Sequence, residues 1–110
     1  MQLRFREIDR GIFDSIKSGE KSVETRAATP RFVNIKKGDV IVFACGKDKF
    51  EKKVKNVNVF RTIPELLKAY GVKQINPKAD SRKDLEKMYY SFPGYRQKIK
   101  ERGLIAMEFE

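Results

Sequence analysis

The sequence predicts a small α+β domain, a mixed β-barrel with helices at its rim. Its 110 residues fit a single domain spanning 1–110 and leave little room for a second. Hydrophobic residues make up 40% of the chain, enough for one compact core. Apolar periodicities follow the order β-α-β-β-β-α-α-α-β, which is typical of a barrel flanked by helices.

The first third of the chain predicts a strand, a helix and a second strand. Residues 3–6 alternate apolar and basic side chains, as on a strand with one buried face. Apolar residues then recur at helical spacing over 7–18, and Gly19 is a natural helix end. Residues 22–27 again have a strand pattern.

The middle of the chain predicts a loop over 28–38 followed by an antiparallel hairpin. The first hairpin strand, 40–45, is the most apolar segment of the chain. The second strand, about 50–60, carries lysines between its apolar residues. Its apolar spacing departs from two between Val54 and Val57, which indicates a bulge or bend.

The last third predicts three helices and a closing strand. Thr62 is a good N-cap, with Glu65 three residues later, and Gly71 ends that helix. The elements that follow are a loop over 71–80, a helix from Ser81, a break at Phe92-Pro93-Gly94, a short basic helix over 94–102 and a strand over 104–109.

The chain is strongly basic, with a formal net charge of +10 and a pI near 9.8. Residues 46–110 carry sixteen Lys and Arg against nine Asp and Glu, a larger excess than in residues 1–45. This balance favours polyanionic partners, because the summed charge steers them toward the surface. A solvated surface rich in Lys and Glu, suited to high temperature, is the alternative interpretation.

Residue types that are absent exclude several classes of site. The chain has one cysteine, Cys45, and no histidine. It therefore has no intramolecular disulfide, no zinc site of the usual kind and no Ser-His-Asp or Cys-His catalysis within the chain. Cys45 ends an apolar run and is interpreted as a core residue. We expect no metal and no cofactor.

The N-terminal residues contain no apolar segment typical of a signal peptide. No stretch approaches the apolar length that crosses a bilayer. We therefore expect a cytoplasmic protein without membrane contact.

One eight-residue segment, 19–26, concentrates the chemistry that suggests a site. Lys21 is a mobile charge at a strand entrance. Glu24 and Arg26 are two residues apart on a strand and share a face, whereas Thr25 takes the other face. The pair is either a structural salt bridge or a recognition pair, with Arg26 binding phosphate or a base edge and Glu24 accepting from an exocyclic amine.

This segment fits the pattern G-x-K-x-x-E-x-R at Gly19, Lys21, Glu24 and Arg26, and so resembles the signature of the ASCH family. The context is also similar to that family: a preceding strand and helix, a Lys-Gly-Asp turn into an apolar strand, and a closing Gly-Leu-Ile-Ala-Met-Glu-Phe strand. The resemblance covers nearly the whole chain. It implies a PUA-like barrel of five or six strands with a cleft lined by the signature residues, acting on RNA in processing, modification or translation-linked regulation.

Some members of that family are amidohydrolases that deacetylate acetylcytidine with a Lys, a Thr and a Glu. Lys21 matches the Lys, but Glu24 stands where those enzymes have Thr. The stretch 71–78 contains no carboxylate to match the Glu. The resemblance therefore argues against this activity. If the chain is an enzyme, Lys21 and Glu24 are its candidate catalytic residues, because burial would let such a pair transfer a proton.

Further basic and aromatic residues are candidates for ligand contact. The predicted hairpin carries several lysines, which either bind phosphates or simply discourage edge-to-edge aggregation. Tyrosines near the C-terminus alternate with basic residues, a pattern that suits base stacking, whereas Tyr89 and Phe92 are expected in the core. Together the expected ligand contacts are Lys21, Glu24, Arg26, Arg31, Lys47, Lys49, Tyr90, Tyr95 and Arg96.

Three hypotheses follow from the sequence. The first is a module that binds RNA or a nucleoside, the second a nucleoside amidohydrolase, and the third an accessory domain whose charge serves only solubility. The sequence leaves the oligomeric state open.

Overall fold

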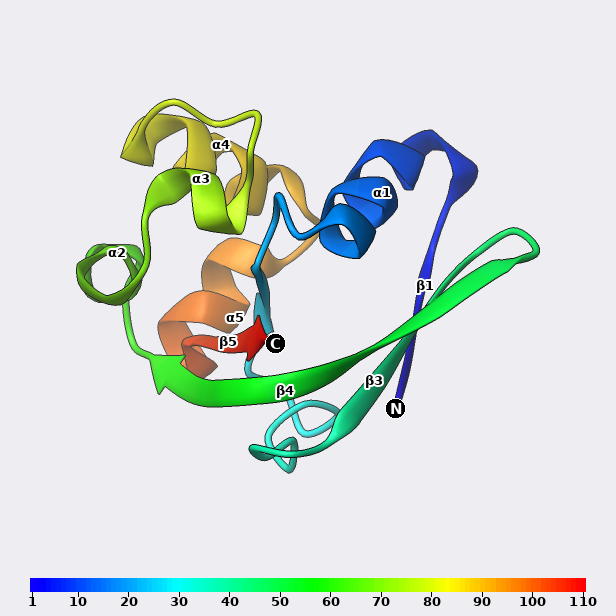
Figure 1. The fold of residues 1–110 in the computed structure, drawn as a ribbon. Coiled ribbons are helices and arrows are strands. Elements are labelled where there is room, and N and C mark those ends of the chain that lie inside the picture. The colour runs from blue at the N-terminus through cyan, green and yellow to red at the C-terminus, as the bar shows by residue number, and fades with distance from the viewer.

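The computed structural model describes all residues, Met1–Glu110, as a curled five-stranded sheet with helices at one open end (Figure 1). The strands are β1 (Gln2–Phe5), β2 (Val23–Ala27), β3 (Val40–Cys45), β4 (Asp48–Phe60) and β5 (Leu104–Phe109). The helices are a 3-10 turn η1 (Glu7–Asp9), then α1 (Arg10–Ser18), α2 (Ile63–Ala69), α3 (Val72–Ile75), α4 (Arg82–Ser91) and α5 (Tyr95–Arg102).

The sheet has the order β1-β3-β4-β5-β2, so β1 and β2 are its two edge strands. β1 pairs with β3 in parallel, and all other neighbours are antiparallel. β4 is long enough to pair with β3 through its first half and with β5 through its second half. Its register shifts between Val54 and Asn56, which confirms the predicted bulge and bends the sheet into a half-barrel.

One apolar cluster packs against each face of the sheet. One fills the half-barrel under α1 and includes Phe13, Phe43 and Met107. The other lies between the far face of β2 and β5 and the helices α2–α5, and includes Leu85 and Leu104. β5 is therefore buried on both faces, which explains why it is apolar at nearly every position.

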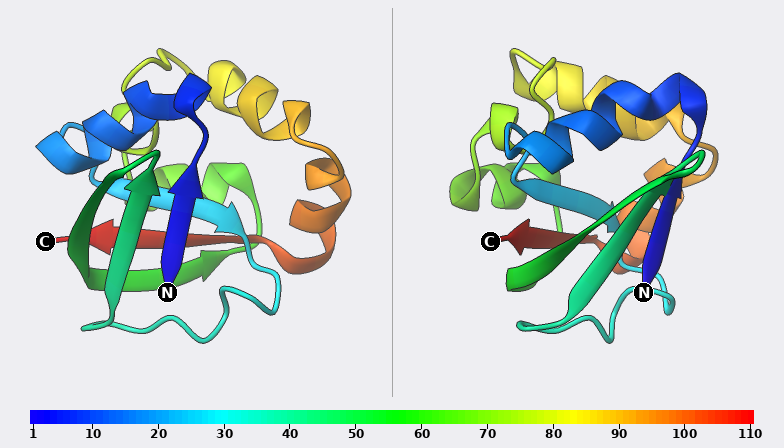
Figure 2. Two further views of the ribbon diagram at one scale, coloured as in Figure 1. Left: turned by 90° about the vertical axis from the view of Figure 1, so that its right-hand side faces the viewer. Right: turned by 45° about the vertical axis from the view of Figure 1, so that its right-hand side comes forward.

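α1 and α4 lie over one open end of the half-barrel, and α5 runs down its side next to β2 (Figure 2). Thr62 and Ser81 cap α2 and α4, accepting hydrogen bonds from the backbone N–H groups of Glu65 and Asp84. The break at Phe92–Gly94 turns the chain between α4 and α5, as predicted. None of the helices has the length and apolar character needed to cross a membrane.

The structure corrects two details of the predicted fold. The expected loop over 71–80 contains the short helix α3, so four helices rather than three follow the hairpin. Phe92, expected in the core, is 42% exposed. It sits at the turn after α4, where its ring packs edge-on against Tyr95.

Candidate functional site

A cleft of about 500 Å³ opens at the seam between the two edge strands. A closed barrel would pair β1 with β2 at this seam, whereas here the seam holds side chains from both strands. The cleft volume lies in the range of pockets that bind small molecules. Its lining comes from β1, α1, β2, the segment after α3, α4 and the start of α5, with Arg4, Phe5, Arg6, Ile12, Lys21, Glu24, Arg26, Asn76, Lys78, Tyr89, Phe92 and Tyr95 among the residues.

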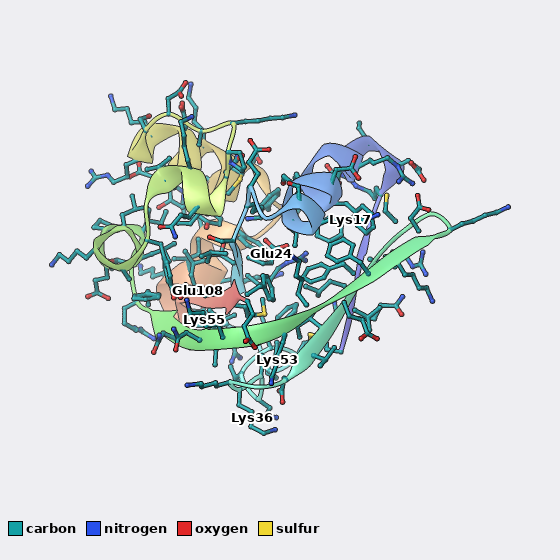
Figure 3. All side chains as sticks on the ribbon, viewed as in Figure 1. Lys17, Glu24, Lys36, Lys53, Lys55 and Glu108 are labelled. Carbon is teal, nitrogen blue, oxygen red and sulfur yellow. The ribbon has the colours of Figure 1, made fainter.

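Glu24 lies at the centre of the molecule, between α1 and the helices on the other side of the cleft (Figure 3). It is only 6% exposed and is hydrogen-bonded on both carboxylate oxygens. Oε1 accepts from the Thr25 backbone N–H at 3.1 Å and lies 3.5 Å from Lys21 Nζ. Oε2 lies 3.3 Å from the guanidinium of Arg26, so the predicted shared face of Glu24 and Arg26 is confirmed.

Lys21 is buried, and its ammonium contacts several acceptors at once. Its ammonium donates to the carbonyl of Val23 at 2.7 Å and to the carbonyl of Ile75, and it faces Glu24. Backbone carbonyls therefore take two of the three N–H donors of the ammonium, and its charge is paired with Glu24. Lys21 thus ties β2 to α3 and orients the carboxylate of Glu24. Burial lowers the pKa of Lys21, and the attraction of Glu24 opposes that shift only in part.

Arg26 is the part of this pair that remains open to a ligand. Its side chain is 27% exposed, and its guanidinium makes only the contact with Glu24 out of five possible N–H donations. The rings of Phe5 and Phe32 flank the guanidinium, with centroids 5.8 and 5.9 Å from Cζ. The aromatic neighbours and the carboxylate together fix the orientation of the guanidinium before any ligand arrives.

Thr25 points to the other face of β2, as predicted, and its hydroxyl is hydrogen-bonded to the hydroxyl of Tyr89 at 2.5 Å. Both groups are buried, and burial raises the pKa of Tyr89 well above its usual value. This bond links β2 to α4 and thereby holds together the part of the cleft lining that these two elements form.

Replacing Tyr89 by phenylalanine is expected to give a stability difference that depends on pH. Near pH 8 the variant loses about 1–2 kcal/mol, because the Thr25 hydroxyl is left buried without its partner. Above pH 10 the tyrosine ionises in the unfolded chain before it ionises in the folded one, so the wild type loses about 1.4 kcal/mol of stability per pH unit from this group. Urea unfolding from pH 8 to 11 should therefore show the difference shrinking toward zero. A difference that stays constant would contradict the buried, neutral Tyr89.

The structure divides the other residues predicted to contact a ligand between the cleft and other surfaces. Tyr95 lines the cleft, and its hydroxyl accepts a hydrogen bond from the backbone of Ala27. Lys47 and Lys49 lie at the exposed hairpin tip and are not part of the cleft lining. Arg31 donates to the carbonyl of Gln2, outside the lining. Tyr90 and Arg96 lie together in a separate groove formed by α4 and α5.

Several cleft residues were missed by reasoning from sequence. Arg4 on β1 and Arg6 directly after it line the cleft, and the alternation of basic and apolar residues over 3–6 was the available signal. Asn76 and Lys78 follow α3, where a loop was expected, and no local pattern distinguishes them. In the structure, no group of three or more Cys, His, Asp or Glu side chains is placed to hold a metal ion.

Comparison with known proteins gives a family and two structural relatives. The model of the ASCH domain family matches residues 8–110. The crystal structure of hypothetical protein PH0355 is 30% identical, covers 100% of this chain and 98% of its own, and has a TM-score of 0.81. The solution NMR structure of protein PF0455 from Pyrococcus furiosus is 28% identical, covers 100% of this chain and 96% of its own, and has a TM-score of 0.77. No curated protein matches the sequence.

Proposed function

The chain belongs to the ASCH domain family, and from this premise we propose that its cleft binds RNA or a nucleotide-like ligand. Membership of the family is consistent with RNA binding in general. The finer proposal is that Arg26 and Glu24 contact the ligand directly, while Lys21 positions Glu24.

The observation that carries the proposal is the arrangement of Arg26. Its guanidinium is oriented by Glu24 and two phenylalanine rings, yet most of its donors have no partner in the protein. A planar, oriented guanidinium suits phosphate oxygens or the acceptor edge of a base. Oε2 of Glu24 lies beside it as an acceptor, so the pair offers a donor and an acceptor next to each other, which matches a base edge.

The charge of the cleft supports an anionic ligand. Five basic side chains and three acidic ones line it, and the chain as a whole carries a formal net charge of +10. Lys78 reaches across the cleft toward α1, where its ammonium would lie 3.7 Å from a Cβ added at Gly11. A phosphate entering the cleft would meet cations from both walls. Binding should therefore weaken as salt is raised, because phosphate contacts release counterions.

The Arg26→Gln variant tests this proposal against Arg31→Gln, which removes the same charge outside the cleft. Affinity for a short single-stranded RNA is measured by fluorescence anisotropy at low and moderate salt. Arg26→Gln is expected to weaken binding about tenfold or more, because charge-assisted hydrogen bonds are lost. Arg31→Gln should have only the small effect of one distant charge.

Two outcomes would count against the proposal. Equal losses in the two variants would show that only overall charge attracts RNA, and would favour the hypothesis of an accessory domain. A wild-type protein that has no measurable affinity for RNA at low salt would also favour the accessory-domain hypothesis. The amidohydrolase hypothesis finds no support in the site, since Lys21 is bound to two backbone carbonyls and paired with Glu24, and the Thr25 hydroxyl is bonded to Tyr89.

A further inference from the structure

A second hollow, of about 410 Å³, lies at the junction of α4, α5 and the start of α2. We name it the α4–α5 groove, and its lining includes Arg61, Ile63, Glu86, Tyr90, Arg96 and Lys100. The groove and the cleft share α4 and the start of α5. Tyr89 and Phe92 line the cleft, whereas Tyr90, next to Tyr89 on α4, lines the groove. The elbow between α4 and α5, at one side of the molecule in Figure 2, contributes Phe92 to the cleft, and the residues on either side of it, Tyr90 and Arg96, line the groove.

The groove gathers positive charge that the protein itself does not neutralise. Arg61, Arg96 and Lys100 are exposed, and none of them lies within 4.0 Å of a carboxylate oxygen. The one carboxylate in the lining, Glu86, is paired with Arg82 at 3.0 Å. Three like charges around one hollow repel one another, so the arrangement is complementary to an anion that enters it.

Aromatic rings accompany these cations. The guanidinium of Arg96 lies over the ring of Tyr90, with Cζ 4.0 Å from the centroid, which restrains the arginine without using its donors. Tyr90 is 38% exposed, and Phe92 at the elbow is 42% exposed. Exposed rings interleaved with unpaired cations suit the bases and phosphates of a single strand better than they suit an acidic peptide, which has no planar bases to stack.

We propose that the α4–α5 groove is a phosphate-binding subsite for the continuation of a single-stranded RNA whose nearby nucleotide occupies the cleft. This proposal rests on the proposed function and narrows it, because it makes the ligand an oligonucleotide rather than a free nucleoside. Phe92 lies at the elbow between the two hollows, where an unstacked base can pack on its exposed ring.

The test compares the Arg61→Gln/Arg96→Gln variant with the Lys83→Gln/Lys87→Gln variant. The control pair lies exposed on α4 outside both hollows and removes the same charge. Affinities are measured for a single-stranded oligoribonucleotide of about six residues and for a nucleoside monophosphate, at two salt concentrations. Thermal unfolding confirms that both variants fold.

The groove variant is expected to bind the oligomer about tenfold more weakly and to reduce its salt slope by about 1.4, with monophosphate affinity unchanged. The control variant should weaken oligomer binding much less. The proposal is overturned by equal losses in the two double variants, by an equal loss for the monophosphate, or by a glutamate hexapeptide that competes as well as the RNA.

Arg26→Gln separates this proposal from the proposed function of the cleft. If Arg26→Gln changes nothing while the groove variant loses oligomer affinity, the cleft proposal fails and the groove remains a nucleic-acid site. If Arg26→Gln weakens both ligands while the groove variant behaves as the control, the cleft proposal stands and the groove proposal fails.

Discussion

Replacing Lys21 by methionine is expected to destabilise the folded chain by about 3 kcal/mol or more. The substitution leaves the carbonyls of Val23 and Ile75 without their donor and removes one of the two cations beside the buried carboxylate of Glu24. Removing one partner of a buried ion pair costs this much because the remaining charge stays desolvated. The variant should also bind RNA less well, since Glu24 and the β2–α3 contact lose their common anchor.

A double variant distinguishes this cause from a simple packing defect. Lys21→Met/Glu24→Met removes both charges together, and it should recover a large part of the lost stability. Lys36→Met is the control, because Lys36 forms an exposed pair with Asp39 and its loss should cost about 0.5 kcal/mol or less. Urea unfolding of the wild type, Lys21→Met, Glu24→Met and the double variant gives the coupling energy between the two residues, with Lys36→Met measured alongside as the control. A Lys21→Met variant as stable as Lys36→Met would contradict the anchoring role.

Gly103→Ala is expected to cost about 4 kcal/mol, a large share of the stability of a small domain. Gly103 has φ +77°, which side-chain-bearing residues rarely adopt. A Cβ at this position would overlap the carbonyl oxygen of Phe60 and lie 3.2 Å from the carbonyl carbon of Phe60. Neither strand can move away cheaply, because Phe60 pairs with Leu104 at the end of the β4–β5 ladder.

Gly38→Ala is the matched control for this substitution. Gly38 also has a positive φ, +94°, but nothing lies within 4 Å of an added Cβ. Its expected cost is about 1–2 kcal/mol, from strain alone. Chemical unfolding of both variants separates the collision from the strain. Equal costs at the two glycines would show that the β4–β5 end is more pliable than the structure indicates.

Local sequence signals predict elements whose own residues determine them. β3 and β5 begin and end where the sequence places them, because glycine turns bound the apolar run of β3 on both sides and Gly103 precedes the apolar run of β5. α3 was missed because its four residues are too few for any periodicity. It is held instead by the burial of Ile75 and by the Gln74 side chain, which accepts from the backbone of Gly71. Such contacts are not visible in a local pattern.

The same limit applies to the site. The shared face of Glu24 and Arg26 follows from strand periodicity, so the sequence predicts it. The bond between Thr25 and Tyr89 joins residues 64 positions apart, and only the packing of α4 on β2 creates it. Tyr90 and Tyr95 were expected together, but the turn between α4 and α5 places them in different hollows. Which hollow each tyrosine enters depends on the direction in which α4 and α5 pack. The sequence of the two helices alone does not specify that direction.

The most direct test of the central claim is an NMR titration of isotope-labelled protein with a short single-stranded RNA and with cytidine derivatives. We expect the shifts to cluster at Lys21, Glu24, Arg26 and Tyr95 and to persist at moderate salt. Lys17, Lys36 and Lys53 lie on other surfaces of the molecule and serve as internal controls (Figure 3). Shifts that spread over these lysines as strongly as over the cleft, and that vanish with modest salt, would contradict the claim that the cleft is a ligand site.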